Sequence, residues 1–288
     1  MKEGDFVFLV GASQSGSIDI LQNGLNTWNE KLKQIFDILT TSPQDFAGGA
    51  VYEVIKTLNG AMQSIGLSLL VIFMLVGVIK KSTSFEDMKR PEQILKLFLR
   101  FVIGKGVITY GMPLMVEIFS VSLGIIGKLN VPQLNNISVA QELITAAQDL
   151  GFFDNLLLSI LAFVGSGAMT VISLLIILTV FGRLFKIYMY MAISPIPLST
   201  FAGEATKAVG ASFLKSFVGV CLEGALILLA CIVYSAYISS AGGDILLPAD
   251  ASAFNKLYSY IISTVLNMLI LLFTIKACDR IVREMMGS

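Results

Sequence analysis

Four ionisable residues interrupt long apolar stretches of the sequence, where a charge is costly. They are Lys105, Glu117, Lys215 and Glu223. Ionisable side chains at membrane depth usually face the interior of a helix bundle, a water-filled cavity or an opposite charge. These four are therefore candidates for lining a cavity or for pairing across helices, and Lys215 is a candidate partner for Glu223. Lys105 has a second interpretation, because its long aliphatic stem can carry the ammonium group to the membrane surface.

A second unusual feature is an apolar, aromatic stretch near residues 187–206 that is interrupted by two prolines. Each proline removes a backbone donor and biases the residue before it away from the helical conformation. In lipid, such a break persists only where protein or a wet cavity satisfies the backbone. We therefore predict a re-entrant or interfacial hairpin at 187–206. Its candidate residues for lining the hairpin or a conduit are Ser194, Pro195, Pro197, Tyr188 and Tyr190.

The residue types needed for enzyme chemistry are sparse. The chain has no His, which removes the commonest general base and metal ligand. It also has no Gly-rich phosphate loop of the Walker type, no serine elbow and no metal-ligand motif. Cys221, Cys231 and Cys278 lie in or beside apolar runs without C-x-x-C spacing, which predicts buried free thiols. We expect no catalytic activity and no cofactor.

The elements that position these residues are predicted to be membrane helices. The 288-residue chain is 55% hydrophobic and 14% charged, with a mean hydropathy of +0.81, which exceeds what the core of a soluble domain requires. We predict an all-α polytopic membrane protein with about five spans, each able to cross about 30 Å of hydrocarbon. The spans are expected near residues 58–79, 101–126, 156–181, 216–238 and 257–275. Pro113 predicts a kink in the second.

The distribution of Lys and Arg predicts the orientation. Most of these residues fall in segments 80–100, 183–215 and 276–283. The positive-inside rule places such segments in the cytoplasm, with the N-terminus extracellular and the C-terminus cytoplasmic. Within the first segment, Lys89, Arg90 and Lys96 are candidates for binding a cytoplasmic partner.

Residues 1–49 are predicted to form an amphipathic helix and a linker on the extracellular side, before a transmembrane domain at 50–288. Apolar residues recur at steps of three and four, which lays one stripe along a helix. They are Ile18, Leu21, Leu25, Trp28, Leu32, Ile35 and Leu39. Three interpretations remain open: a helix on the bilayer surface with Trp28 at the headgroups, a coiled-coil seam, or packing on the membrane domain.

Three runs of the sequence resemble the TrbL-like conjugal transfer membrane proteins of Gram-positive integrative and conjugative elements. They are FGRLFKIYMYMAISPIPLSTFAGEATKAVGASFLKSFVGVCLEGALILLACIVYSAY, LLVIFMLVGVIKKSTSFEDMKRPEQILKLFLRFVIGKGVITYGMPLM and IKACDRIVREMMG. The resemblance implies a polytopic subunit of a type IV secretion system in the cytoplasmic membrane. It would act beside a transfer ATPase and small bitopic subunits, and help relaxase-bound single-stranded DNA to leave the cell. No residue-level role carries over.

Other classes of function stay open on the residues alone. The small residues at 165–168 allow close helix approach and favour a homo-oligomer, in which a conduit would form a central ring. A scaffold that holds the ATPase at the membrane would need no conduit. The alternative class is a secondary transporter or small channel with a midplane site at the broken segment. The absence of a second broken segment and of an internal repeat disfavours that alternative.

Overall fold

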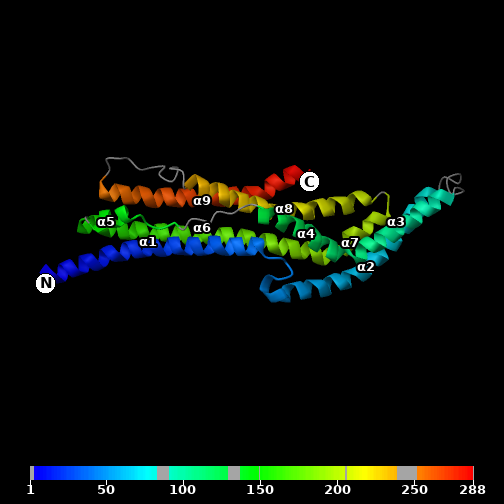
Figure 1. The fold of residues 1–288 in the computed structure, drawn as a ribbon, viewed down its shortest axis with the longest axis horizontal. Coiled ribbons are helices and arrows are strands. Elements are labelled where there is room, and N and C mark those ends of the chain that lie inside the picture. The colour runs from blue at the N-terminus through cyan, green and yellow to red at the C-terminus, as the bar shows by residue number, and fades with distance from the viewer. Residues whose placement is uncertain are drawn as a thin grey trace. The chain divides into compact units, whose positions relative to one another are not determined.

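The structure is a computed structural model that describes residues 3–82, 91–128, 137–148, 150–204, 206–238 and 252–287. All regular secondary structure in these residues is helical (Figure 1). The elements in chain order are α1 (Glu3–Thr40), η1 (Phe46–Gly49), α2 (Ala50–Ser82), α3 (Pro91–Thr109), α4 (Gly111–Lys128), α5 (Gln141–Gln148), α6 (Phe152–Ile193), α7 (Pro195–Leu198), η3 (Ser199–Ala202), α8 (Lys207–Tyr237) and α9 (Ala253–Met286).

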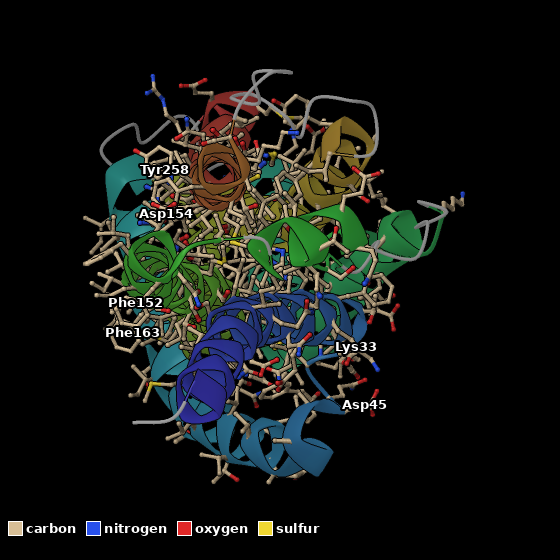
Figure 2. All side chains as sticks on the ribbon, turned by 90° about the vertical axis from the view of Figure 1, so that its left-hand side faces the viewer. Lys33, Asp45, Phe152, Asp154, Phe163 and Tyr258 are labelled. Carbon is tan, nitrogen blue, oxygen red and sulfur yellow. The ribbon has the colours of Figure 1, made fainter. Side chains whose placement is uncertain are left out.

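Five helices of the described chain are long and apolar enough to cross a membrane. They cover Phe46–Ile79, Gly111–Lys128, Phe152–Ile193, Lys207–Tyr237 and Ala253–Met286. Large apolar side chains are exposed along them, including Phe163, which is 71% exposed and points away from α6 in Figure 2. Side chains of this kind suit contact with lipid rather than water. The predicted class, an all-α polytopic membrane protein, is confirmed.

The span predicted near residues 101–126 differs in the structure, because two helices share it. Helix α3 ends at Thr109 and α4 begins at Gly111. The amide of Tyr110 still donates to the Gly106 carbonyl at 2.9 Å, so the chain turns without losing that bond. The break therefore precedes Pro113, which lies in the first turn of α4, where a helix needs no backbone donor.

The contacts between Cα atoms divide the chain into two compact units. The first unit comprises Met1–Leu39, Asn130–Val180 and Leu226–Ala277. The second unit comprises Thr40–Leu129, Phe181–Ala225 and Cys278–Ser288. All the candidate site residues that the structure describes belong to the second unit.

In the first unit, the N-terminal stripe is buried by protein. Trp28 is 1% exposed, and its ring meets that of Tyr234 edge-on at 6.3 Å between centroids. Helix α1 also approaches α6 so closely that a Cβ added at Gly24 would lie 2.7 Å from the Ser166 hydroxyl oxygen. Of the three interpretations of the stripe, the structure supports packing on the membrane helices. The predicted small-residue patch at 165–168 is part of this contact.

In the second unit, α2, α3, α7 and η3 pack together around a small apolar core. Leu70, Ile108, Leu198 and Ala202 form its buried centre. A Cβ added at Gly66 of α2 would lie 2.6 Å from the Pro195 carbonyl oxygen, so glycine permits backbone contact at the predicted break. The packing thus brings α2 against the segment that follows α6.

Candidate functional site

The predicted break is present at Ser194, but its backbone differs from the prediction. Helix α6 runs to Ile193 and the short helix α7 begins at Pro195. Ser194 has φ −50° and ψ −36°, so the expectation that Pro195 would move it out of the helical region is wrong. Pro195 occupies the first position of α7, where its missing donor costs nothing within that helix and its fixed φ suits the helix. The cost falls instead on α6, because Pro195 has no backbone N–H to donate to the Met191 carbonyl, as another residue at this position would.

Asn59 of α2 satisfies the carbonyl that Pro195 leaves free. Its Nδ2 donates to the Met191 carbonyl oxygen at 2.6 Å and to the Ser194 hydroxyl at 3.0 Å. The Ser194 hydroxyl donates to the same Met191 carbonyl at 3.0 Å. Asn59 is 2% exposed, so water cannot replace it. We call Asn59, Met191, Ser194 and Pro195 the break network.

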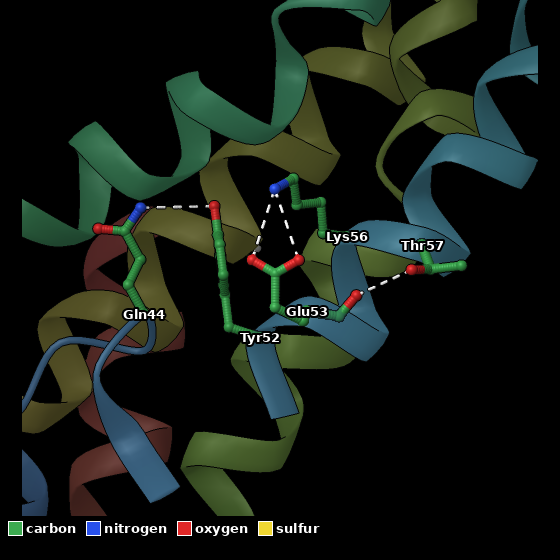
Figure 3. Close-up of polar contacts among 5 residues, drawn as sticks. All are labelled: Gln44, Tyr52, Glu53, Lys56 and Thr57. Atoms are coloured by element: carbon green, nitrogen blue, oxygen red, sulfur yellow. Dashed lines mark hydrogen bonds and ion pairs between the residues drawn. The ribbon is translucent and has the colours of Figure 1, made fainter. Parts of the chain in front are cut away.

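The sequence predicted no role for Asn59, which lies in the span expected near residues 58–79. The available signal was a pair of amide side chains, Asn59 and Gln63, in an apolar run, which does not reveal a partner 132 residues away. The polar residues near the start of α2 bond within that helix or, for Tyr52, to Gln44 just before it (Figure 3). Thr57 donates to the Glu53 carbonyl one turn earlier at 3.0 Å, and Lys56 pairs with Glu53 at 3.4 Å.

Hydroxyl groups satisfy the rest of the turn between α7 and α8. Ser199 donates to the Ile196 carbonyl at 2.6 Å, and Thr200 donates to the Pro197 carbonyl at 2.6 Å. Thr206 donates to the Thr200 carbonyl at 2.8 Å. The Ile196, Pro197 and Thr200 carbonyls therefore have hydrogen-bond partners within the chain.

The five residues predicted to line the hairpin or a conduit divide into two groups. Ser194, Pro195 and Tyr188 are buried, and the Tyr188 hydroxyl donates to the Pro43 carbonyl at 2.8 Å. These three side chains therefore make their contacts within the chain. Pro197 and Tyr190 are half-buried, which leaves part of each side chain accessible.

The two arms of the hairpin are the end of α6 and the start of α8, which lie side by side. Tyr190 of α6 contacts the rings of Phe213 and Phe217 of α8, with centroids 5.3 and 6.0 Å apart. Arg183, the first residue of the basic segment 183–215, is buried between the arms and only 2% exposed. Its Nε and a terminal nitrogen donate to the Val220 and Cys221 carbonyls at 2.9 Å each.

A cavity of about 340 Å³ opens beside this hairpin in the second unit. Its residues come from α6, α8 and the last turns of α9: Lys186, Tyr190, Ser216, Gly219, Val220, Glu223, Asp279, Val282 and Arg283. Lys186 pairs with Asp279 at 3.4 Å, and Arg283 pairs with the same carboxylate at 2.8 Å. Glu223 is 3% exposed, and its Oε2 has no hydrogen-bond partner.

The structure does not bring the four predicted intramembrane charges together. Glu223 faces the cavity, whereas Lys215, its expected partner, is exposed on α8 and forms no ion pair with it. Lys105 on α3 and Glu117 on α4 are also exposed. These three side chains lie on the outside of the chain and not in an internal cavity of the described residues.

The predicted cytoplasmic partner loop is only partly described. Lys96 is exposed on α3. Lys89 and Arg90 lie outside the described residues.

In the part of the chain that the structure describes, no group of three or more His, Cys, Asp or Glu residues is placed to hold a metal ion. Cys221, Cys231 and Cys278 are buried free thiols, as predicted.

The fold and the hairpin define a polytopic helical membrane protein whose long sixth helix ends at a proline break. Comparison with protein families matches residues 28–195 to the TrbL/VirB6 plasmid conjugal transfer like protein family. This match covers more than half of the chain, and the chain belongs to that family, which makes it a conjugal transfer membrane component. Searches of curated proteins and of solved structures gave no match.

Proposed function

We propose that the chain is a membrane subunit of a conjugative type IV secretion system in a Gram-positive host. In this proposal it helps relaxase-bound single-stranded DNA to cross the cytoplasmic membrane, and it assembles as a homo-oligomer. Its other partners are membrane lipid, a transfer ATPase and small bitopic subunits. The observation that carries the proposal is the family match at residues 28–195, which contains Asn59, Met191, Ser194 and Pro195 of the break network.

The exposed ionisable residues favour a subunit with a covered or wet face. Glu117 lies on the exposed face of α4 beside Leu114 and Val121, which are 40% and 67% exposed. A charge facing hydrocarbon costs at least about 2.5 kcal/mol at the bilayer centre, so a partner or water is expected to cover this face. Lys105 on α3 raises the same requirement. A conduit between copies of the chain would meet it.

The orientation in this proposal follows the charge distribution. The C-terminus, with Lys276, Arg280 and Arg283, lies in the cytoplasm and the N-terminus outside. The exposed Lys96 of α3 is then available to a cytoplasmic partner such as the ATPase. The basic segment 80–100, which contains Lys96, should attract acidic surfaces, and this attraction should weaken at high salt.

The test is a mating assay combined with formaldehyde cross-linking in donor cells. The chain is replaced by wild type, Lys105→Leu or Lys33→Leu, the last being an exposed lysine on α1. We expect the wild type to co-precipitate transferred DNA, Lys105→Leu to lose DNA contact and mating, and Lys33→Leu to keep both. Loss of mating on deletion without any DNA contact in the wild type would favour the scaffold. Mating that is unaffected by deletion of the chain would refute the proposal.

A further inference from the structure

The cavity beside the hairpin contains an acceptor that the chain leaves without a partner. Glu223 lines this cavity, and its Oε2 makes no hydrogen bond although the residue is 3% exposed. Leaving a buried carboxylate oxygen unpaired is costly, more so than for a neutral acceptor. A group that supplies N–H or O–H donors to Glu223 would remove this cost. The site therefore favours a ligand with a donor at its inner end.

The mouth of the same cavity carries the opposite charge. Lys186 and Arg283 share the single carboxylate of Asp279, so these three side chains have a net charge of +1. They are also the accessible part of the site, with side chains 41%, 63% and 36% exposed for Lys186, Arg283 and Asp279. The cavity thus has a negative, buried floor and a positive, accessible mouth.

This charge pattern fits a zwitterion with a phosphate and a terminal ammonium group. The phosphate would bind the guanidinium and ammonium groups at the mouth. The ammonium group would reach Glu223 at the floor, where its N–H donors meet the free Oε2. An anion alone, such as a nucleic-acid phosphate, would leave Glu223 unsatisfied and would be repelled by it.

The position of the cavity along α9 identifies the source of such a group. Asp279, Val282 and Arg283 follow the apolar run near residues 257–275 and lie where charged residues begin again. This is the composition of a helix at the boundary between hydrocarbon and headgroups. We propose that the cavity binds the headgroup of phosphatidylethanolamine, with the acyl chains remaining in the bilayer. This inference does not depend on what the chain transports.

Three lipids of graded chemistry test the proposal. The purified full chain is reconstituted in nanodiscs with phosphatidylglycerol alone, or with an equal fraction of phosphatidylethanolamine or phosphatidylcholine. Bound lipids are then counted by native mass spectrometry. Phosphatidylcholine has the same phosphate and positive charge but no N–H donor, so it cannot bond Glu223. A hydrogen bond to a charged group contributes about tenfold or more in affinity. We therefore expect the protein to retain phosphatidylethanolamine about tenfold better than phosphatidylcholine.

The variants separate the cavity from a general charge effect. Glu223→Met keeps the approximate shape but removes both the charge and the hydrogen-bond acceptor, and should bring the retention of the two lipids close to equal. Glu142→Met is the matched control, since it removes an exposed carboxylate on α5 outside the cavity lining, and should keep the wild-type preference. Equal retention of the two lipids by the wild type overturns the proposal without any variant. An unchanged preference in Glu223→Met, or a preference lost equally in Glu142→Met, also overturns it.

A further arm distinguishes the lipid from its free headgroup. Soluble phosphoethanolamine is added to the nanodiscs that contain phosphatidylethanolamine. We expect the lipid to stay bound, because its acyl chains hold it at the site. Full displacement by the soluble compound at equal concentration would assign the cavity to a water-soluble phosphoamine and would overturn the lipid assignment.

Discussion

Replacing Asn59 by Leu tests whether the break network holds the hairpin. The change keeps the approximate volume and removes three hydrogen bonds. Asn59 donates to the Met191 carbonyl at 2.6 Å and to the Ser194 hydroxyl at 3.0 Å, and its Oδ1 accepts from Gln63 at 3.3 Å. Each such bond contributes a net of about 0.5–1.5 kcal/mol, so the expected loss of stability is about 1.5–4.5 kcal/mol. Interhelical bonds in membranes average about 0.6 kcal/mol, which supports the lower part of this range.

The assay is thermal unfolding of the purified chain in nanodiscs, with mating frequency measured in parallel. For a chain of this size, about 1 kcal/mol corresponds to about 2–4 °C in Tm, so a decrease of several degrees is expected. Thr57→Ala is the matched control on the same helix, because its hydroxyl bonds only within α2 and the residue is exposed. It should change stability by less than about 0.5 kcal/mol.

A double-mutant cycle with Ser194→Ala isolates the bond between the two side chains. Asn59 and Ser194 are in direct contact, so their effects should not add, and the coupling should be about 0.5–1.5 kcal/mol. If Asn59→Leu is no more destabilising than Thr57→Ala, the Met191 carbonyl does not depend on Asn59. The reasoning about the proline break would then be refuted.

Three further experiments test the packing around Gly224, Trp28 and the buried cysteines. Gly224→Ala would place a methyl group on the Arg183 guanidinium and should lower stability by about 1–3 kcal/mol, whereas Gly182→Ala, with open space at its Cβ, should be neutral or slightly stabilising in a melting assay. Trp28→Ala should cost about 3–5 kcal/mol by the same assay, against a much smaller effect for the exposed Phe163→Ala; equal effects would contradict the burial of the N-terminal stripe. The three buried cysteines should resist maleimide in the native chain and react in SDS, and fast native labelling would show that their helices open.

Local patterns in the sequence predicted the elements well. The stripe that contains Leu21, Trp28 and Leu39 has a helical period, and all three residues are buried on α1. The prolines at 195 and 197 marked the end of α6 correctly. What the stripe packs against could not be predicted, because the same period suits a membrane surface, a coiled coil or a bundle.

The side-chain partners were less accessible to prediction. Glu223 was singled out from the sequence as a charge in an apolar run, but the only partner within reach of a sequence argument was Lys215, on its own helix. Its cavity is built by α6 and by Asp279 and Arg283 of α9, which only the packing brings together. For Arg183 the sequence indicated only a basic segment that follows the third predicted span, and the space for its guanidinium depends on Gly224, 41 residues later.

The close approach of helices at glycine has a consequence for the temperature range of the protein. Gly24 beside Ser166 and Gly66 beside Pro195 bring backbone and side-chain atoms together without a large apolar side chain at the contact. In lipid such contacts are held by van der Waals attraction and hydrogen bonds. Stabilisation by water exclusion fades on cooling, but these contacts do not rely on it. A donor cell that stops mating in the cold should therefore be limited by stiffening of its bilayer, with this subunit still folded.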